Sequence, residues 1–139
     1  MARLAASWLR RPPTHSNESI RVAKELFDAF NAHDLDRLED LASDGFVGIR
    51  PDSPTLRTGP RGARSWASAY FSAFPDSKWT KERIFANGTA FVLQVIYTGT
   101  HMGTFGGDGG IQPTRKVVTV AATFVGIARN GKIEHMRGY

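Results

Sequence analysis

His101 and Tyr97 lie at the end of the most apolar stretch of the chain, residues 91–98, and can both move protons. β-Branched and aromatic residues favour a strand, and alternation along it places both side chains on the apolar face. An imidazole exchanges protons near neutral pH, whereas a phenol can donate a hydrogen bond to a developing oxyanion. Roughly 13 Å of strand separates the two residues, so they would contact opposite ends of one ligand. We therefore predict both as catalytic residues; the alternative for His101 is a structural hydrogen bond to a backbone carbonyl.

Two other features could contribute to a site. Arg50 ends a short predicted strand; turned inward it would pair with an anionic ligand group, whereas the alternative that we favour is contact with Asp52 or solvent. The glycine-rich run at residues 106–110 lacks the Lys-Ser/Thr of a phosphate-binding loop, and we interpret it as a mobile lid over a cavity. No spacing of histidines or carboxylates indicates a metal ligand set, so we predict no metal.

Helices are predicted mainly in the first half of the chain. They are residues 19–33, a short helix capped by Asp34 and ended by residues 43–45, and residues 61–74. Leu26 and Phe30 lie on the apolar stripe of the first helix, and Trp66 is buried by the third. A sheet surface that follows these helices in the chain would pack against those apolar stripes.

The rest of the chain is predicted to form that sheet. The predicted strands are residues 46–50, 78–85, 89–101, 116–128 and 132–139, with loops at 51–60 and 103–113 and hairpin turns at Asn87-Gly88 and Asn130-Gly131. This order predicts an α+β fold in which three N-terminal helices pack on one face of a curved, mostly antiparallel sheet and enclose a pocket. Because the inward residues are mostly apolar, we expect a small, flat, apolar molecule as the ligand.

Composition limits the classes of function. The chain has 139 residues, which suits one domain, and no run of apolar residues long enough to span a membrane. Three arginines and no acid lie in residues 1–17, so the rest carries 18 − 3 = 15 basic and 13 acidic residues, and this near balance argues against nucleic-acid binding. We interpret residues 1–17 as a flexible basic tail before a domain at 18–139. The absence of cysteine is compatible with a reducing cytoplasm, where we expect the protein.

Several short motifs together carry a resemblance to a known family. They are AFNAHDLD at residues 29–36, GP at 59–60, FPD at 74–76, GTHMGTF at 99–105, PTR at 113–115 and NGKI at 130–133. In their order and spacing the chain resembles the nuclear transport factor 2-like cone fold and, within it, the SnoaL-like polyketide cyclases. The resemblance implies aldol-type ring closure of an apolar, polyketide-like carbonyl compound, without a metal or organic cofactor, in a homodimer formed through the outer sheet face.

The sequence departs from this family at its expected acid. The resemblance implies a carboxylic acid late in the last strand, which would fall just past Tyr139, and Glu134 comes too early to replace it. Ketosteroid isomerases share the cone fold that this chain resembles, and alignment places their three functional groups on Leu26, Arg50 and Thr123. None of these side chains can do that chemistry, so steroid isomerisation by that mechanism is not expected.

The aligned positions, together with the apolar faces of the helices, still predict which residues contact a ligand. These predicted contacts are Leu26, Phe30, Arg50, Trp66, Thr123 and Met136, with Met136 turned inward and His135 outward on the last strand. The leading hypothesis is a cofactor-independent cyclase-like enzyme. The alternatives are a non-catalytic binding module of the same fold and a dimerisation domain whose interior is filled by its own aromatic side chains.

Overall fold

The computed structural model describes residues 14–107 and 109–139, which form helices and strands in an α+β order. In chain order the elements are α2 (His15–Asn31), α3 (Leu35–Leu41), β1 (Ala42–Ile49), β2 (Leu56–Thr58), α4 (Gly59–Ala73), β3 (Lys78–Asn87), β4 (Ala90–Thr100), β5 (Val117–Arg129) and β6 (Lys132–Gly138). No helix in this described part is long and apolar enough to cross a membrane.

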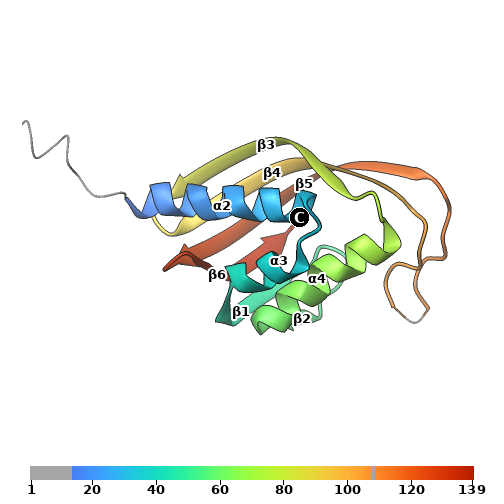
Figure 1. Cartoon of the computed structure of the whole chain (residues 1–139), viewed down its shortest axis with the longest axis horizontal. Helices are drawn as coiled ribbons and strands as arrows, with labels where there is room; N and C mark the ends of the chain where they lie inside the picture. The colour runs from blue at the N-terminus through green and yellow to red at the C-terminus, as the bar shows by residue number, and fades with distance from the viewer. Residues whose placement is uncertain (1–13, 108) are drawn as a thin grey trace, which may run out of the picture.

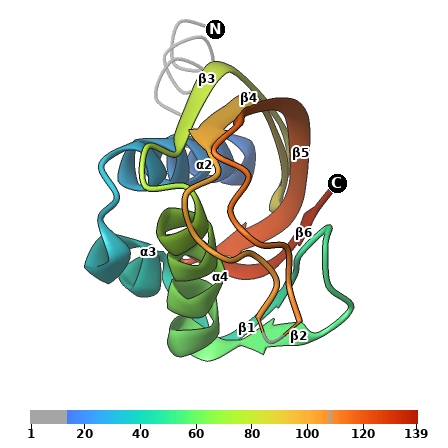
Figure 2. The same ribbon diagram turned by 90° about the vertical axis from the view of Figure 1, so that its right-hand side faces the viewer.

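The strands form one sheet in the order β2-β1-β6-β5-β4-β3. Neighbouring strands are antiparallel except β1 and β6, which run parallel. Register shifts in the β3–β4 and β5–β6 pairs mark bulges, which bend strands, and Figures 1 and 2 show the sheet curving around the three helices. The predicted fold, with three helices on a curved, mostly antiparallel sheet, is confirmed.

α2 begins earlier than the sequence predicts. Thr14 caps it by accepting a hydrogen bond from the backbone of Asn17, whereas the hydroxyls of Ser16 and Ser19 bond the turn at Gly88. Those polar side chains therefore tie the helix to the β3–β4 hairpin instead of starting it. Of the predicted tail, residues 15–17 lie in α2, and residues 1–13 lie outside the described residues.

The segment between α3 and α4 also differs from the prediction. The predicted Asp34 cap is present, but β1 begins directly after α3, and β2 occupies part of the predicted loop 51–60. Ala42 and residues 47–49 pair in parallel with β6, with a register shift over residues 43–46, and residues 47–49 also pair with Leu56–Thr58. This long-range pairing on both sides extends β1 across a local sequence that signals a turn.

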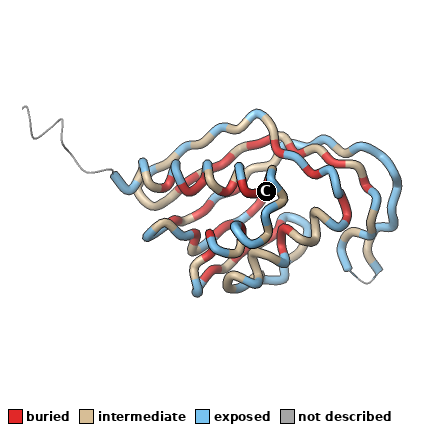
Figure 3. Tube along the Cα trace, in the orientation of Figure 1, coloured by how far each residue is buried: buried red, intermediate tan, exposed pale blue. Residues whose placement is uncertain are grey.

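The core lies between the helices and the inner face of the sheet. Along β4 every second residue is buried, from Phe91 through Leu93 to Tyr97, as alternation predicts. Across the layer, Phe30 of α2 stacks on Trp79 of β3, with ring centroids 3.8 Å apart and an interplanar angle of 6°. Figure 3 shows the buried positions on the facing sides of helices and strands.

We predict that Leu93→Ala lowers the free energy of unfolding by about 2–5 kcal/mol, because Leu93 is fully buried and truncation leaves a cavity. The matched control is Leu56→Ala, since Leu56 is 54% exposed on β2 and should change stability by about 0.5 kcal/mol or less. Urea denaturation followed by circular dichroism measures both variants. Similar losses in the two would contradict the assigned core.

Candidate functional site

A cavity of about 340 Å³ lies between the helices and the concave face of the sheet. Its walls are almost wholly apolar and mostly aromatic. The aromatic lining residues are Phe30, Phe46, Trp66, Tyr70, Phe74, Trp79, Tyr97, Phe105, Phe124 and Tyr139. The volume is near the lower end for small-molecule sites, and the lining favours a flat apolar ligand over a sugar or nucleotide.

Four of the predicted ligand contacts line this cavity. Leu26 and Phe30 reach it from α2, Trp66 from α4 and Met136 from β6. Met136 is buried while His135 is exposed, in agreement with the predicted direction of the last strand. Their contact with a ligand remains a prediction.

Thr123 does not reach the cavity. In the β4–β5 register the inward Leu93 pairs with Phe124, and Thr123 pairs with Gln94 on the outer face. The cavity is lined instead by the two neighbours of Thr123, Ala122 and Phe124. The cavity lining therefore does not support the predicted ligand contact of Thr123, since a one-residue shift on a strand reverses the direction of the side chain.

Tyr97 lines the cavity, but its proton is already used in a hydrogen bond. The Ser77 hydroxyl donates to the carbonyl of Phe74 at 2.7 Å and lies 2.9 Å from the Tyr97 hydroxyl. Because Ser77 has one hydrogen, Tyr97 donates to Ser77. Burial raises the pKa of Tyr97 to about 12, so it remains a phenol at neutral pH. This geometry does not favour the predicted role of Tyr97 as oxyanion donor.

His101 is 4% exposed and packs behind Phe74 instead of lining the cavity. The two ring centroids lie 5.1 Å apart. Nδ1 of His101 accepts the backbone N–H of Thr114 at 3.3 Å, which places the proton of the neutral ring on Nε2. Within the described residues that Nε2 has no hydrogen-bond partner. The catalytic role predicted for His101 therefore lacks contact with the cavity, and its backbone partner is an N–H, not the carbonyl of the alternative.

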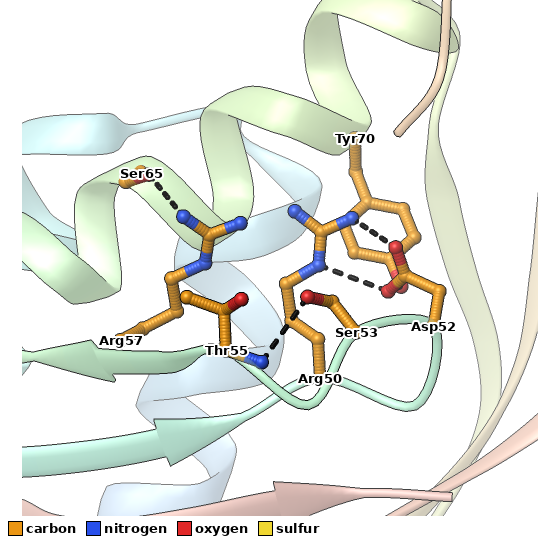
Figure 4. A network of polar contacts seen from close by, with 7 residues as sticks. All are labelled: Arg50, Asp52, Ser53, Thr55, Arg57, Ser65 and Tyr70. Carbon is orange, nitrogen blue, oxygen red and sulfur yellow. Dashed lines mark hydrogen bonds and ion pairs between the residues drawn. The ribbon is translucent and has the colours of Figure 1, made fainter. Parts of the chain in front are cut away.

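Arg50 is buried at one edge of the cavity. Its Nε donates to Oδ1 of Asp52 at 2.9 Å and its Nη2 to Oδ2, which is the pairing that we favoured from the sequence (Figure 4). The guanidinium carbon lies 5.2 Å and 5.3 Å from the ring centroids of Tyr70 and Phe105. Because its charge is already paired, Arg50 is not a free site for an anionic ligand.

Tyr70 completes a polar cluster that sequence reasoning missed. Its hydroxyl lies 3.4 Å from Oδ1 of Asp52, and its ring lines the cavity. Burial, followed by the negative charge of Asp52, raises the pKa of Tyr70 well above its ordinary value. The sequence signal was present in part: Asp52 follows an inward arginine by two residues, but nothing local indicates that Tyr70 on α4 meets it. No group of three or more His, Asp or Glu in the described part of the chain could hold a metal.

Comparisons with known proteins agree on the fold. The sequence profile described as SnoaL-like polyketide cyclase matches residues 20–139. A protein from Jannaschia sp. CCS1, provisionally named a SnoaL-like polyketide cyclase, has a TM-score of 0.80 and 24% identity over 93% of this chain and 88% of that chain. IdmH from Streptomyces antibioticus, provisionally named a polyketide cyclase, has a TM-score of 0.71 and 22% identity over 87% of this chain and 90% of its own.

AclR from Streptomyces galilaeus, provisionally named a hydroxylase, has a TM-score of 0.72 and 22% identity over 89% of this chain and 75% of its own. No curated protein matches the sequence. The similar structures therefore confirm the cone fold, and because they carry names of two reaction types, they do not decide the activity.

We predict that the free energy of unfolding falls as pH rises from about 10 to about 12 and that Tyr97→Phe weakens this fall. The folded protein keeps the Tyr97 proton up to a pKa of about 12, whereas the unfolded chain releases it near its ordinary pKa of 10.0. The contribution of Tyr97 to the free energy of unfolding is thus fully present below pH 10 and is lost as the pH rises toward about 12. Urea titrations at several alkaline pH values measure the slope, with the exposed Tyr139→Phe as control. A Tyr97→Phe slope equal to that of the unmodified protein would be evidence against a buried phenol.

Proposed function

Because the chain belongs to the SnoaL-like polyketide cyclase family, we propose that it is a cofactor-independent enzyme acting on an apolar, polyketide-like carbonyl compound. The proposed reaction is proton transfer followed by aldol-type cyclisation. The observation that carries the proposal is an apolar cavity whose wall meets a cluster of ionised and phenolic groups at one edge. A ligand can bury its rings in such a cavity while placing one polar end at that cluster.

The cavity suits an intramolecular reaction. A base removes a proton next to one carbonyl, the resulting enolate carbon bonds to a second carbonyl of the same molecule, and the new alkoxide takes up a proton. The proton that is removed is matched by the proton that is taken up, and the total oxidation state of the molecule does not change, so the reaction requires no oxidant or reductant. Aromatic walls such as those of Phe30, Trp66 and Trp79 hold a flexible chain in a compact, folded shape, which lowers the entropic part of the barrier.

Tyr97 and His101 then have positioning roles. Both rings contact Phe74, at centroid distances of 5.7 Å and 5.1 Å, and His101 also holds Thr114 in the segment between β4 and β5. We propose that they fix this wall of the cavity and do not exchange protons with the ligand.

A non-catalytic binding module is the second candidate function. One observation favours it: on the described part of β6 the acidic side chain is Glu134, which pairs with Arg129 at 3.7 Å and does not line the cavity. The third possibility, a dimerisation domain with a filled interior, is not favoured, because a cavity of about 340 Å³ remains between the aromatic side chains.

The outer face of the sheet supports a proposed homodimer. Phe85 and Val125 are 51% and 40% exposed there, and Val92 stands between them in the cross-strand register. An exposed, continuous row of apolar side chains on a sheet is typical of a protein–protein interface. We also propose a cytoplasmic location, from the absence of cysteine, and we expect no nucleic-acid partner, because charge is nearly balanced outside residues 1–17.

We predict that Ala122→Leu weakens binding of naphthol, a flat fluorescent probe, by at least about tenfold, because the larger side chain occupies part of the cavity. The matched control is Thr123→Leu, which adds the same side chain one residue later on the outer face. Fluorescence titration of the purified proteins measures both affinities. Equal affinities for the two variants, or no binding by the unmodified protein, would argue against a ligand in this cavity.

For the homodimer, we predict a sedimentation mass twice that of the 139-residue chain and dissociation in Val125→Asp, because the new charge would be buried in the interface. Ile20→Asp on α2 is the control, since Ile20 is 41% exposed and lies away from the sheet surface. Analytical ultracentrifugation separates the outcomes. A monomeric unmodified chain would refute the predicted dimer.

A further inference from the structure

We infer that Asp52 is the base of the proposed reaction, held by Arg50 and Tyr70, and that it acts on a carbon acid activated by conjugated or paired carbonyl groups. The inference rests on the proposed function and adds to it the residue that removes the proton and the class of substrate. It comes from the position of Asp52, the free lone pairs of its carboxylate and the charges around it, not from the sequence resemblance.

The parallel pairing of β1 and β6 brings Asp52 beside the edge of the cavity, next to lining residues although it is not one of them. Ile49 pairs with Arg137, so the residues after Ile49 run beside the end of β6. Pro51 Cδ lies 3.0 Å from the point where a Cβ of Gly138 would stand, and Pro51 itself lines the cavity. Asp52 therefore lies between two lining residues, Pro51 in the chain and Tyr70 in space.

The carboxylate of Asp52 is oriented and still able to accept a proton. Oδ1 accepts from Arg50 Nε at 2.9 Å and faces the Tyr70 hydroxyl at 3.4 Å, whereas Oδ2 accepts from Arg50 Nη2 (Figure 4). Each carboxylate oxygen can accept two hydrogen bonds, so Oδ2 retains one position. The Asp52 side chain is 26% exposed and that of Arg50 is 3% exposed, so the arginine is fixed while the carboxylate can be reached.

Several other carboxylates are held by partners away from the cavity. In residues 14–107 and 109–139, Asp52 is the one whose side chain hydrogen-bonds a cavity-lining side chain. Asp76 accepts from the backbone and hydroxyl of Thr100, and Glu134 pairs with Arg129. Arg64 bonds the two acidic side chains of α3 that approach α4.

The surrounding charges define the substrate. When a substrate C–H bond breaks, its proton goes to Asp52 and its electron pair forms the enolate. The negative charge thus moves from the carboxylate to the enolate, while Arg50 stays positive nearby. The enolate oxygen can then accept the hydrogen bonds that the neutral carboxyl group no longer accepts. Tyr70 keeps its proton, because burial raises its pKa, and can donate to the same oxygen. Any carboxylate is a weak base compared with a simple enolate, which restricts the substrate to carbons whose anion is spread over more than one group.

A model carbon acid can replace the natural substrate in a test of this role. Nitrobenzisoxazole is flat, bicyclic and apolar; a base removes its ring C–H proton, the electron pair forms a C≡N bond, and the N–O bond breaks to give a coloured phenolate. We expect the full chain to accelerate this elimination over an equal concentration of acetate. Asp52→Asn should lower the rate at least about tenfold, and Asp52→Glu, which keeps a carboxylate, should recover part of it.

Asp76→Asn is the matched control, because Asp76 is also a carboxylate held by hydrogen bonds, and its partner Thr100 does not line the cavity. Thermal unfolding and naphthol affinity are measured on each variant. Loss of elimination in Asp52→Asn, with folding and naphthol binding retained, supports the role of Asp52. An Asp52→Asn rate equal to the unmodified rate overturns it and leaves the proposed function standing.

Two other outcomes separate the two proposals. Naphthol binding without any acceleration of the elimination overturns the role of Asp52 and favours the binding module. If the unmodified protein binds neither naphthol nor nitrobenzisoxazole, the proposed function fails and the role of Asp52 fails with it. If Asp52→Asn does not fold, Asp52→Glu decides. Elimination by the folded glutamate variant supports the role of Asp52, and a folded glutamate variant without any elimination overturns it.

Discussion

A curved sheet covered by helices on its concave face is the constraint on which this structure depends. Straight helices cannot follow a bent sheet at every point, so contact is close at some places and a gap remains between them. Close contact occurs at the stack of Phe30 on Trp79, where α2 lies on β3. The gap is the cavity of about 340 Å³, bounded by α2, α4 and the inner residues of β4 to β6. The bulges that bend the strands are thus as important for the cavity as its lining residues.

The polar groups of the interior fall into two sets with different consequences. One set is used up within the fold: Tyr97 donates to Ser77, and His101 accepts from Thr114. These bonds hold the wall of the cavity and satisfy the Tyr97 hydroxyl and Nδ1 of His101, whereas Nε2 of His101 has no partner within the described residues. The second set, Arg50 with Asp52 and Tyr70, lies at the cavity edge and is partly exposed. The proposed chemistry on a ligand uses the second set, because the Asp52 carboxylate is partly exposed and keeps a free acceptor position, whereas the Tyr97 proton is already bonded to Ser77.

Local pattern predicted most of the elements and the faces that follow from alternation. The inward side of β4, the apolar stripe of α2 and the cap at Asp34 were readable from residue type and spacing, whereas the inward direction of Met136 came from the alignment. Alignment to a distant family was less dependable for single residues. It selected Thr123, whereas Ala122 and Phe124 on either side line the cavity, because a shift of one position reverses the direction of a strand side chain.

The sequence by itself determined the α+β class, the order of helices and strands, the apolar character of the interior and the near absence of free charge within it. These properties follow from periodicity and composition, which act over a few neighbouring residues. Only the tertiary structure decided which polar side chains meet. Arg50 and Tyr70 are 20 residues apart and join through Asp52, since the parallel β1–β6 pair and α4 bring them to one edge of the sheet. Likewise, His101 is kept from the cavity by Phe74, a contact between the end of α4 and the end of β4 that no local pattern encodes.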